Sequence, residues 1–317
     1  MKTIAILGAS GYIGKNLLAR LAGLTEYRIK ILSRRTDAFP DGYPQGSVEL
    51  YVGDLCDPES LTGFLEPGCI VVNLIYSWGG GRDQNLAMTS NLINLCRTAR
   101  VKKLIHCSTA AVVGRVDSDE VTENTPSHPV TDYGLTKLKI EQLLFTVLQN
   151  VCDFIVLRPT AVFGVGAAPL QKLSSDLVAG SRLRNYLKAC LFARRRMNLV
   201  HIDNVLAAIS FVAEYEGKLG GEIFIVSDDD VEANNFSYVE NFLIKKLNIQ
   251  PYPLPPISLP LGFLAFLLRC LGRNNVNPRC NYSSGKLLGL GFVRPKNFES
   301  GLADYADSLG SSNHSSK

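Results

Sequence analysis

Three glycines stand at three-residue spacing near the N-terminus, at Gly8, Gly11 and Gly14. The apolar run Ile4–Leu7 precedes them, and residues 12–22 follow with apolar side chains at helical spacing. In a strand-to-helix turn of this kind, the first glycine permits a tight turn and the second lets a ligand approach the backbone. The third lets the helix pack closely on the strand. Because free N–H groups at the helix start attract anions, the motif predicts a pyrophosphate site.

Short apolar segments alternate with helical segments along the first half of the chain. After the strand at 4–7, the predicted strands cover 28–32, 48–52, 69–75, 103–107 and 154–157. The predicted helices cover 12–22, 85–99 and 133–149, and a further helix is predicted to start at 57–61. Near-continuous apolar strands between helices are typical of a parallel sheet covered on both faces. The predicted fold class is therefore α/β, a doubly wound parallel sheet with a smaller, mainly helical C-terminal substrate region.

The regular alternation fades beyond about residue 165. The length of 317 residues suits one large domain or two unequal ones. We predict a dinucleotide-binding domain over 1–164, with its sheet completed by 199–227. A substrate-binding region is predicted over 165–198 and 228–307, followed by a disordered tail at 308–317.

Composition excludes several classes of protein. The net charge of +4 argues against a nucleic-acid partner. The eight cysteines form no Cys-x-x-Cys pair, which argues against a zinc site and predicts no bound metal. Free cysteines and the absence of a signal peptide predict a cytoplasmic protein. The apolar stretch 259–268 is too short for a transmembrane segment, and contact of 257–271 with a membrane surface is left open.

The residues after the second and third strands bear on the choice of dinucleotide. Where many NAD-binding proteins present an acid to the ribose, this chain has Arg34 and Arg35. Guanidinium groups suit the 2′-phosphate of NADP, although solvated surface arginines would look the same in sequence. We therefore predict NADP, with NAD as the alternative. The Asp54 carboxylate either accepts a hydrogen bond from the adenine amino group or caps the following turn.

Tyr133 and Lys137 stand four residues apart on a predicted helix, so they share one face. A nearby ammonium group lowers the pKa of a phenol by stabilising the phenolate, which suits acid–base catalysis. Thr109 follows the strand 103–107, at the end of a parallel sheet where ligands bind. These three residues form the predicted catalytic site.

Taken together, these motifs resemble the extended short-chain dehydrogenase/reductase family, of the NAD-dependent epimerase/dehydratase type that modifies nucleotide sugars and has a Rossmann-type sheet. Further matching segments are 85–92, 157–164, 199–205 and 288–302. Two departures are Val113, where the family usually has Tyr, and Asn204, which replaces an acid. The segment after the fourth strand, with Asn73 to Ile75 in place of small residues, also departs and is predicted to narrow the cofactor cleft.

The resemblance implies that Tyr133 is the acid/base, that Lys137 also holds the nicotinamide ribose, and that Thr109 orients the substrate. The implied cofactor contacts are Gly8, Ser10, Gly11, Tyr12, Ile13, Gly14, Arg34, Arg35, Asp54, Leu55, Leu74, Tyr133, Lys137 and Pro159. The implied substrate contacts are Thr109, Ala110, Tyr133, Thr160, Arg195 and Arg196. The family often pairs through the helices 85–99 and 133–149, which implies a homodimer.

Basic residues far outnumber the single acid, Asp176, between residues 171 and 196. Arginines in this segment could bind a diphosphate in bidentate fashion, or they could be the solvated face of a helix. A nucleotide-diphosphate sugar is the leading substrate class. Arg34 and Arg35 favour a keto-sugar reductase over a 4-epimerase, because the epimerases of this family retain NAD.

Two other functions stay open. The apolar stretch from 257 to 271 is compatible with a hydroxysteroid- or lipid-type dehydrogenase of the same family. A non-catalytic NADP(H)-binding sensor would usually lack Tyr133 or Lys137, and both are present. Two further residues invite attention: Trp78, beside three glycines, either lines the cleft or closes a loop, and His106 is predicted to be a core histidine with satisfied hydrogen bonds.

Overall fold

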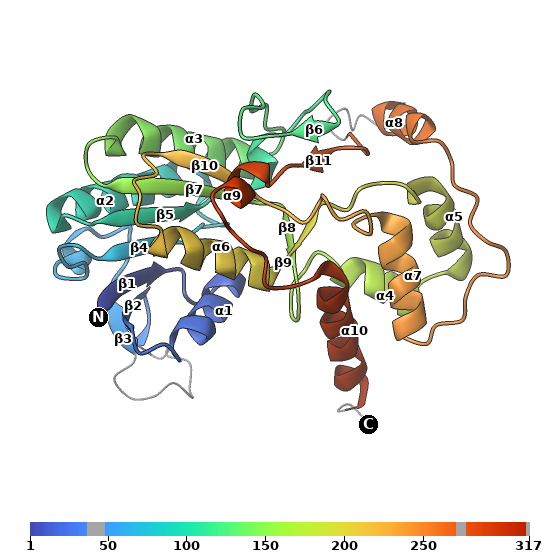
Figure 1. Cartoon of the computed structure of the whole chain (residues 1–317), viewed down its shortest axis with the longest axis horizontal. Coiled ribbons are helices and arrows are strands. Elements are labelled where there is room, and N and C mark those ends of the chain that lie inside the picture. Colours follow the sequence, from blue (N-terminus) through green and yellow to red (C-terminus); the bar gives the residue numbers. More distant parts are fainter. Residues whose placement is uncertain (37–47, 271–276, 315–317) are drawn as a thin grey trace. The chain divides into compact units, whose positions relative to one another are not determined.

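The protein is described by a computed structural model that covers residues 1–36, 48–270 and 277–314. The chain divides into two compact units (Figure 1). Unit 1 contains Met1–Val112, Thr131–Arg158 and Leu206–Phe224, and unit 2 contains Val113–Val130, Pro159–Val205 and Ile225–Lys317. Relative to the predicted boundaries, residues 113–130 and 159–164 belong to unit 2.

A seven-stranded sheet forms the centre of unit 1, with strand order β10-β7-β5-β4-β1-β2-β3. Its strands are β1 (Lys2–Leu7), β2 (Tyr27–Ser33), β3 (Val48–Val52), β4 (Ile70–Asn73), β5 (Lys103–Cys107), β7 (Asp153–Pro159) and β10 (Glu222–Val226). The five pairings from β3 to β7 are parallel. The order reverses between β1 and β4, which confirms the doubly wound α/β class and creates a ligand-binding switch point at the carboxyl ends of these strands.

Helices cover the sheet on both faces. They are α1 (Tyr12–Leu21), α2 (Gly81–Ala99), α3 (Asp132–Leu148) and α6 (Ile202–Glu214). α2 and α3 pack together over a core that includes Ala5, Val71 and Leu104, and Figure 1 shows α1 and α6 on the other side. β4 and β5 are buried along their whole length, because helices exclude water from both of their faces.

Two predicted elements differ in the structure. The helix expected to start at 57–61 is only a 3-10 turn over Glu59–Leu61. The fourth strand, predicted to reach Ile75, ends at Asn73, because the Asn73 side chain accepts a hydrogen bond from the Ile75 N–H (3.1 Å) and turns the backbone away from the sheet.

Unit 2 is mainly helical, as predicted. Its helices are α4 (Gln171–Ala179), α5 (Arg182–Phe192), α7 (Phe236–Lys246), α8 (Leu261–Cys270), α9 (Gly285–Gly289) and α10 (Phe298–His314). Two short parallel pairs accompany them, β8 (Ala161–Phe163) with β9 (Leu199–His201) and β6 (Glu120–Val121) with β11 (Asn281–Tyr282). Of the segment 199–227, therefore, β10 joins the main sheet as predicted and β9 does not.

The predicted disordered tail at 308–317 is wrong for most of its length, because α10 continues to His314; residues 315–317 lie outside the described residues. The helix begins in the core of unit 2, where Phe298, Leu302 and Tyr305 pack together with Phe163 and Val239. These three side chains recur every third or fourth residue, so they lie on one buried face of the helix. The N-terminal part of α10 is therefore packed into the core of unit 2.

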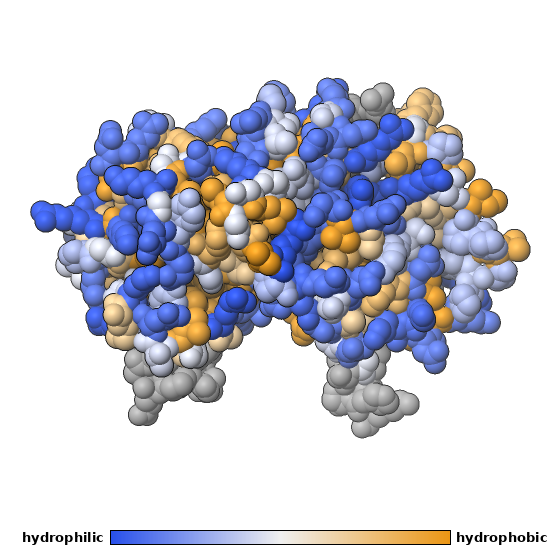
Figure 2. All heavy atoms as spheres, viewed as in Figure 1, coloured by the Kyte–Doolittle hydropathy of each residue, from blue (hydrophilic) through white to orange (hydrophobic). Residues whose placement is uncertain are grey.

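Hydrophilic residues cover most of the face shown in Figure 2, with hydrophobic residues in smaller groups. α8 exposes Phe263 and Phe266, so the apolar stretch predicted from sequence is a surface helix in this region. Within residues 1–36, 48–270 and 277–314, no helix combines the length and the apolarity that crossing a membrane requires.

Candidate active site

The glycine turn connects β1 to α1 and has the geometry of an anion cradle. Gly8 has φ +88°, a left-handed conformation that favours glycine, and a Cβ there would come within 3.0 Å of the Leu74 backbone. A Cβ on Gly14 would stand 2.1 Å from the Gly8 carbonyl oxygen, so only glycine fits. Gly11 occupies the N-cap of α1, and in the described part of the chain no side chain caps that helix start. The residues present therefore fit a dinucleotide pyrophosphate.

The catalytic candidates come together in unit 1 because α3 begins just before Tyr133. The Thr131 side chain accepts a hydrogen bond from the Gly134 N–H (3.1 Å) and caps the helix. One turn later Lys137 is only 2% exposed, and its ammonium donates to the Cys107 carbonyl at the end of β5 (2.9 Å). The Thr109 hydroxyl hydrogen-bonds Tyr133. Thr109, Tyr133 and Lys137 thus lie at one site, as the sequence predicts.

The electrostatics of Tyr133 differ from the sequence expectation. Burial raises the pKa of Tyr133 to about 12, and the hydrogen bond from Thr109 only partly opposes this. The expected lowering by Lys137 is not what dominates, because the phenol is largely shielded from water and burial disfavours the phenolate. Burial also lowers the pKa of Lys137, against the opposing influence of Cys107 and Glu141. At neutral pH Tyr133 is therefore a protonated phenol, a proton donor.

Two aromatic side chains from the segment after β4 shield Tyr133. The Trp78 ring stacks on the Tyr133 ring, with centroids 4.9 Å apart and an interplanar angle of 20°. The Tyr76 ring meets Tyr133 edge-on at 4.8 Å and 87°. The Lys137 ammonium lies 5.4 Å from the Tyr76 centroid, within cation–π range. Tyr76 was not among the predicted site residues, and only its position directly after a central strand could have signalled it.

A buried ionic network behind the catalytic pair was also missed. Glu141, one turn beyond Lys137 on α3, pairs with Arg158 of β7 through two hydrogen bonds (3.1 and 2.6 Å). The Ser108 hydroxyl donates to the same carboxylate. All three side chains are at most 4% exposed. A charged residue inside the apolar strand 153–159 was the available signal, because a buried arginine requires a partner.

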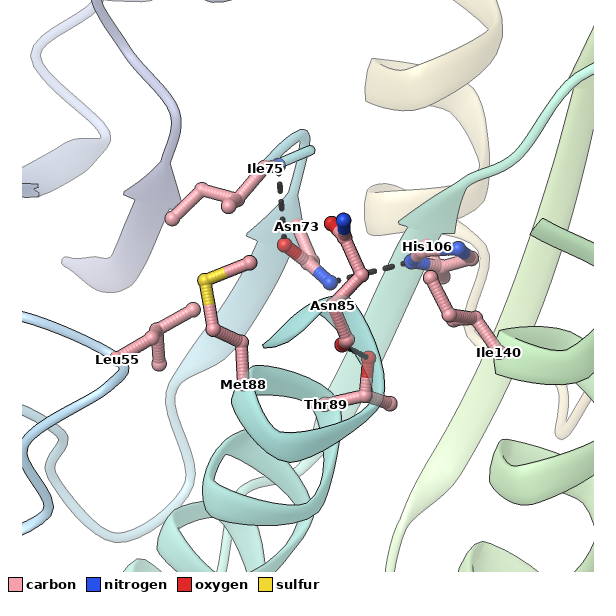
Figure 3. Close-up of a pocket in the computed structure, with 8 residues that line it drawn as sticks. All are labelled: Leu55, Asn73, Ile75, Asn85, Met88, Thr89, His106 and Ile140. Atoms are coloured by element: carbon pink, nitrogen blue, oxygen red, sulfur yellow. Dashed lines mark hydrogen bonds between the residues drawn. The ribbon is translucent and has the colours of Figure 1, made fainter. Parts of the chain in front are cut away.

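Figure 3 shows a small pocket lined by residues of β4, β5, α2 and α3 among others, with room for about one water molecule. Eight residues line it: Leu55, Asn73, Ile75, Asn85, Met88, Thr89, His106 and Ile140. The Asn73 amide donates to His106 Nδ1 (3.1 Å), whereas Nε2 has no hydrogen-bond partner among the described residues. Burial, and secondly the Lys137 charge, hold the pKa of His106 well below its usual value. His106 is thus a neutral core histidine, as predicted. Only one of its two ring nitrogens has a hydrogen-bond partner among the described residues, whereas partners for both were expected.

The remaining cofactor candidates of unit 1 lie around the switch point. Asp54 follows β3, and its Oδ1 accepts a hydrogen bond from the Cys56 N–H (2.9 Å), so this carboxylate caps a turn. Leu55 is buried in the pocket wall, and the Leu74 N–H donates to the Leu7 carbonyl (2.9 Å). The adenine and ribose contacts implied for these residues, and for Ser10, Tyr12 and Ile13, stay predictions.

Arg34 and Arg35 directly follow β2 and are both exposed. The Ser33 hydroxyl hydrogen-bonds both the N–H and the carbonyl of Arg35 (3.1 and 3.0 Å), so the backbone turns immediately after the strand. Arg34 and Arg35 therefore stand at the carboxyl end of β2, and their contact with a 2′-phosphate stays a prediction.

Ala110 lies in a buried 3-10 turn (Ala110–Val112) of unit 1, while the other predicted substrate residues belong to unit 2. The Thr160 hydroxyl is buried without a hydrogen-bond partner in the part of the chain that the structure describes, directly after Pro159. Arg195 lies 5.7 Å from the Phe192 ring centroid, and Arg196 Nη1 donates to the Val231 carbonyl (3.1 Å). Their substrate contacts stay predictions.

The basic residues between 171 and 196 have partners within the protein. Asp176 forms ion pairs with Arg184 (3.1 Å) and Lys188 (2.7 Å). The only acidic residue between 171 and 196 therefore already neutralises two of the basic residues there. Arg182 hydrogen-bonds the Gln250 side chain (3.1 Å) and the Pro251 carbonyl. These three cations therefore have protein partners, as Arg195 and Arg196 also do, and the choice of phosphate ligands stays a prediction.

Two of the departures from the family pattern, Val113 and Asn204, have a structural reason. Val113 is fully buried, so it is a core residue rather than a substrate contact. Asn204 donates to the buried Asp228 carboxylate (3.0 and 3.1 Å) and also bonds the Lys296 backbone. Burial raises the pKa of Asp228 to about 6. An acid at position 204 would add a second buried carboxylate, whereas the Asn204 amide supplies donors.

The fold and the Tyr133/Lys137 site define the extended short-chain dehydrogenase/reductase class. A family model described as the NAD dependent epimerase/dehydratase family matches residues 4–227. The chain belongs to the NAD-dependent epimerase/dehydratase family, as its motifs predict.

Relatives with curated names differ in substrate. The mouse (Mus musculus) sterol-4-alpha-carboxylate 3-dehydrogenase, decarboxylating, is 24% identical over 287 residues, which are 85% of this chain and 75% of that protein. UDP-glucose 4-epimerase of Azospirillum brasilense is 32% identical over 151 residues, which cover 44% and 43% of the two chains. The crystal structure of dTDP-glucose 4,6-dehydratase from Bacillus anthracis in complex with NAD has a TM-score of 0.75 at 17% identity, over 99% of this chain and 98% of that one. The last likeness shows the fold alone.

The buried network yields a stability prediction. Glu141→Gln preserves shape but leaves the Arg158 guanidinium buried without its counter-charge, so the free energy of unfolding in urea should fall by about 3–5 kcal/mol. Asp307→Asn removes an exposed partner of Lys246 (3.6 Å) and should leave the unfolding curve nearly unchanged. Equal effects of the two substitutions would contradict the structural role given to Glu141.

Proposed function

We propose that this protein is an NADPH-dependent reductase that acts on the keto group of a nucleotide-diphosphate sugar. The observation that carries the proposal is the Tyr133 phenol, which is hydrogen-bonded to Thr109 and whose pKa burial raises to about 12. Reduction of a carbonyl needs a proton donor beside the reacting oxygen, whereas oxidation of an alcohol needs a base. A phenol with a raised pKa suits reduction.

In the proposed reaction, Thr109 and Tyr133 both hydrogen-bond the substrate carbonyl oxygen. A dinucleotide with its pyrophosphate at the glycine turn would supply the hydride that the carbonyl carbon receives. Tyr133 gives its proton to the oxygen, so that the C=O double bond becomes a C–OH group. Lys137, held on the Cys107 carbonyl, stabilises the phenolate until a proton from water restores the phenol.

Two observations support a nucleotide-diphosphate sugar as the substrate class. UDP-glucose 4-epimerase and dTDP-glucose 4,6-dehydratase, to which this chain is similar, are named for such sugars. Arg195 and Arg196 supply guanidinium groups, which bind phosphate in bidentate fashion. Arg196 uses one of its five N–H donors on Val231, which leaves donors for a phosphate.

A second candidate is a dehydrogenase that acts on a hydroxyl group of an apolar ring skeleton. The match to the mouse sterol dehydrogenase covers 85% of this chain, whereas the matches to UDP-glucose 4-epimerases of Azospirillum brasilense and Vibrio cholerae cover 44% and 72%. The aromatic rings of Tyr76 and Trp78 beside Tyr133 favour an apolar neighbour for the reacting carbon.

Removal of the phenol tests the catalytic role. Tyr133→Phe should retain NADPH affinity and lose turnover by about 10²- to 10⁴-fold, because the proton donor is gone while the glycine turn is intact. Tyr51→Phe removes a phenol from β3 of the same unit and should keep full activity. Steady-state rates and an NADPH titration measure both effects. Near-normal turnover in Tyr133→Phe would exclude Tyr133 as the proton donor.

The pH dependence follows from the raised pKa of Tyr133, about 12. Because the acid form prevails below that pKa, kcat/KM for carbonyl reduction should stay flat between about pH 6 and pH 9. Alcohol oxidation needs the phenolate and should rise about tenfold per pH unit over the same interval. A reduction rate that falls steeply between pH 7 and pH 9 would assign the proton to another group.

The cofactor preference is tested at the end of β2. Replacement of Arg34 and Arg35 by Ala should weaken NADPH binding by about 10- to 100-fold and leave NADH binding unchanged, because only NADPH carries the 2′-phosphate. Arg97→Ala removes an exposed cation from α2 and serves as the control. Kd values come from titrations of the purified protein. Equal losses for both cofactors, or NAD retained through purification, would favour the 4-epimerase instead.

A further inference from the structure

The only tryptophan of the chain lies directly over the catalytic phenol. Trp78 is 77% exposed, and its indole stacks on the Tyr133 ring at 4.9 Å. Tyr76 contacts both rings edge-on, at 4.8 Å from each. The result is a cluster of three aromatic rings around the proton donor, in which Trp78 presents most of its surface to solvent.

Hydrogen bonds hold the backbone on both sides of this exposed ring. Asn85, which is 2% exposed at the start of α2, accepts a hydrogen bond from the Ser77 N–H and donates to the Ser77 carbonyl, both at 2.9 Å. Its amide also donates to the Gly81 carbonyl (2.6 Å). The Ser77 hydroxyl bonds the Gln84 side chain (3.2 Å). Ser77 and Gly81, which flank Trp78 in sequence, are therefore tied to a buried amide, while the indole itself contacts the Tyr76 and Tyr133 rings.

A molecule that receives the Tyr133 proton must come close to this indole. Proton transfer requires the reacting oxygen within about 3 Å of the phenol oxygen. Trp78 covers one face of the same phenol ring, so a ring that carries the reacting carbon comes within van der Waals reach of the exposed indole surface. Binding sites for small molecules commonly use aromatic side chains in this way, with a few polar groups that set orientation.

We infer that Trp78 is a specificity-determining residue that packs against the apolar face of a substrate ring while the ring's carbonyl or hydroxyl group meets Tyr133 and Thr109. The inference deepens the proposed function and rests on it. The ligand chemistry is a cyclic ketone or alcohol with a C–H-rich face. A hexose and a fused alicyclic skeleton both offer such a face, so the experiment compares the two.

Trp78 itself is the fluorescent probe. Because it is the only tryptophan of the chain, the tryptophan fluorescence comes from this residue alone. NADPH is titrated first: its reduced nicotinamide absorbs indole emission, so quenching reports cofactor binding independently of any substrate. UDP-glucose and androstane-3,17-dione are then titrated separately, with and without NADP⁺. We expect the probe whose ring occupies the site to shift or quench the emission saturably. A response to UDP-glucose identifies a sugar ring, and a response to the dione identifies a fused alicyclic ring.

Substitutions supply the second readout, with the substrate that the wild-type protein turns over. Trp78→Ala should raise KM by about 3- to 10-fold with kcat within about twofold, because ring packing is lost while Tyr133 and Thr109 stay. Trp78→Phe should restore most of the affinity. Leu24→Ala, which removes an exposed apolar side chain of unit 1 outside this aromatic cluster, is the control.

The outcomes separate the inference from the proposed function. Absence of NADPH quenching together with absence of NADPH turnover overturns the proposed function. If NADPH binds but neither UDP-glucose nor androstane-3,17-dione changes the Trp78 emission, the inference alone is overturned. An unchanged KM in Trp78→Ala overturns it as well. A Trp78→Ala protein that loses NADPH affinity but keeps its substrate KM also overturns the inference, because the indole would then contact the cofactor.

Discussion

The site depends on how α3 is attached to the sheet. The Lys137 ammonium bonds the carbonyl at the end of β5, and Glu141, one turn further, pairs with Arg158 of β7. These buried charges are costly to desolvate, and their geometry must be satisfied or the helix is destabilised. Together these contacts fix the rotation of α3 about its axis and its position along the sheet. The Tyr133 phenol is thereby placed beside Thr109. A purely apolar interface would allow the helix to slide by small amounts without a comparable cost.

The surroundings of Tyr133 explain why its charge behaviour differs from a simple Tyr–Lys pair. A lysine four residues away on a helix favours the phenolate, but two aromatic rings and the protein interior exclude water and favour the neutral phenol. Burial wins here because Lys137 directs its ammonium to a backbone carbonyl. The same aromatic rings that help to exclude water from Tyr133 would, under the proposed function, also form the surface nearest to the reacting group.

Much of the fold could be predicted from sequence because its signals are local. Val48–Val52 and Lys103–Cys107 agree residue by residue with the predicted strands, because each is a short, mainly apolar stretch with clear ends. The failures have equally local causes. Asn73 ends its strand through a side-chain bond that hydropathy does not register. The polar segment from residue 308 is predicted to be disordered from sequence, although α10 extends to His314 from the buried Leu302 and Tyr305.

The sequence by itself determined the glycine turn, the Tyr133/Lys137 pair and the family, because each depends on residue type at a fixed short spacing. Only the tertiary structure decided the protonation of Tyr133, the pairing of Glu141 with Arg158, and the place of Trp78 over the phenol. These properties arise from residues on different elements, and their energies depend on distance and on exclusion of water, neither of which is written in the order of residues along the chain.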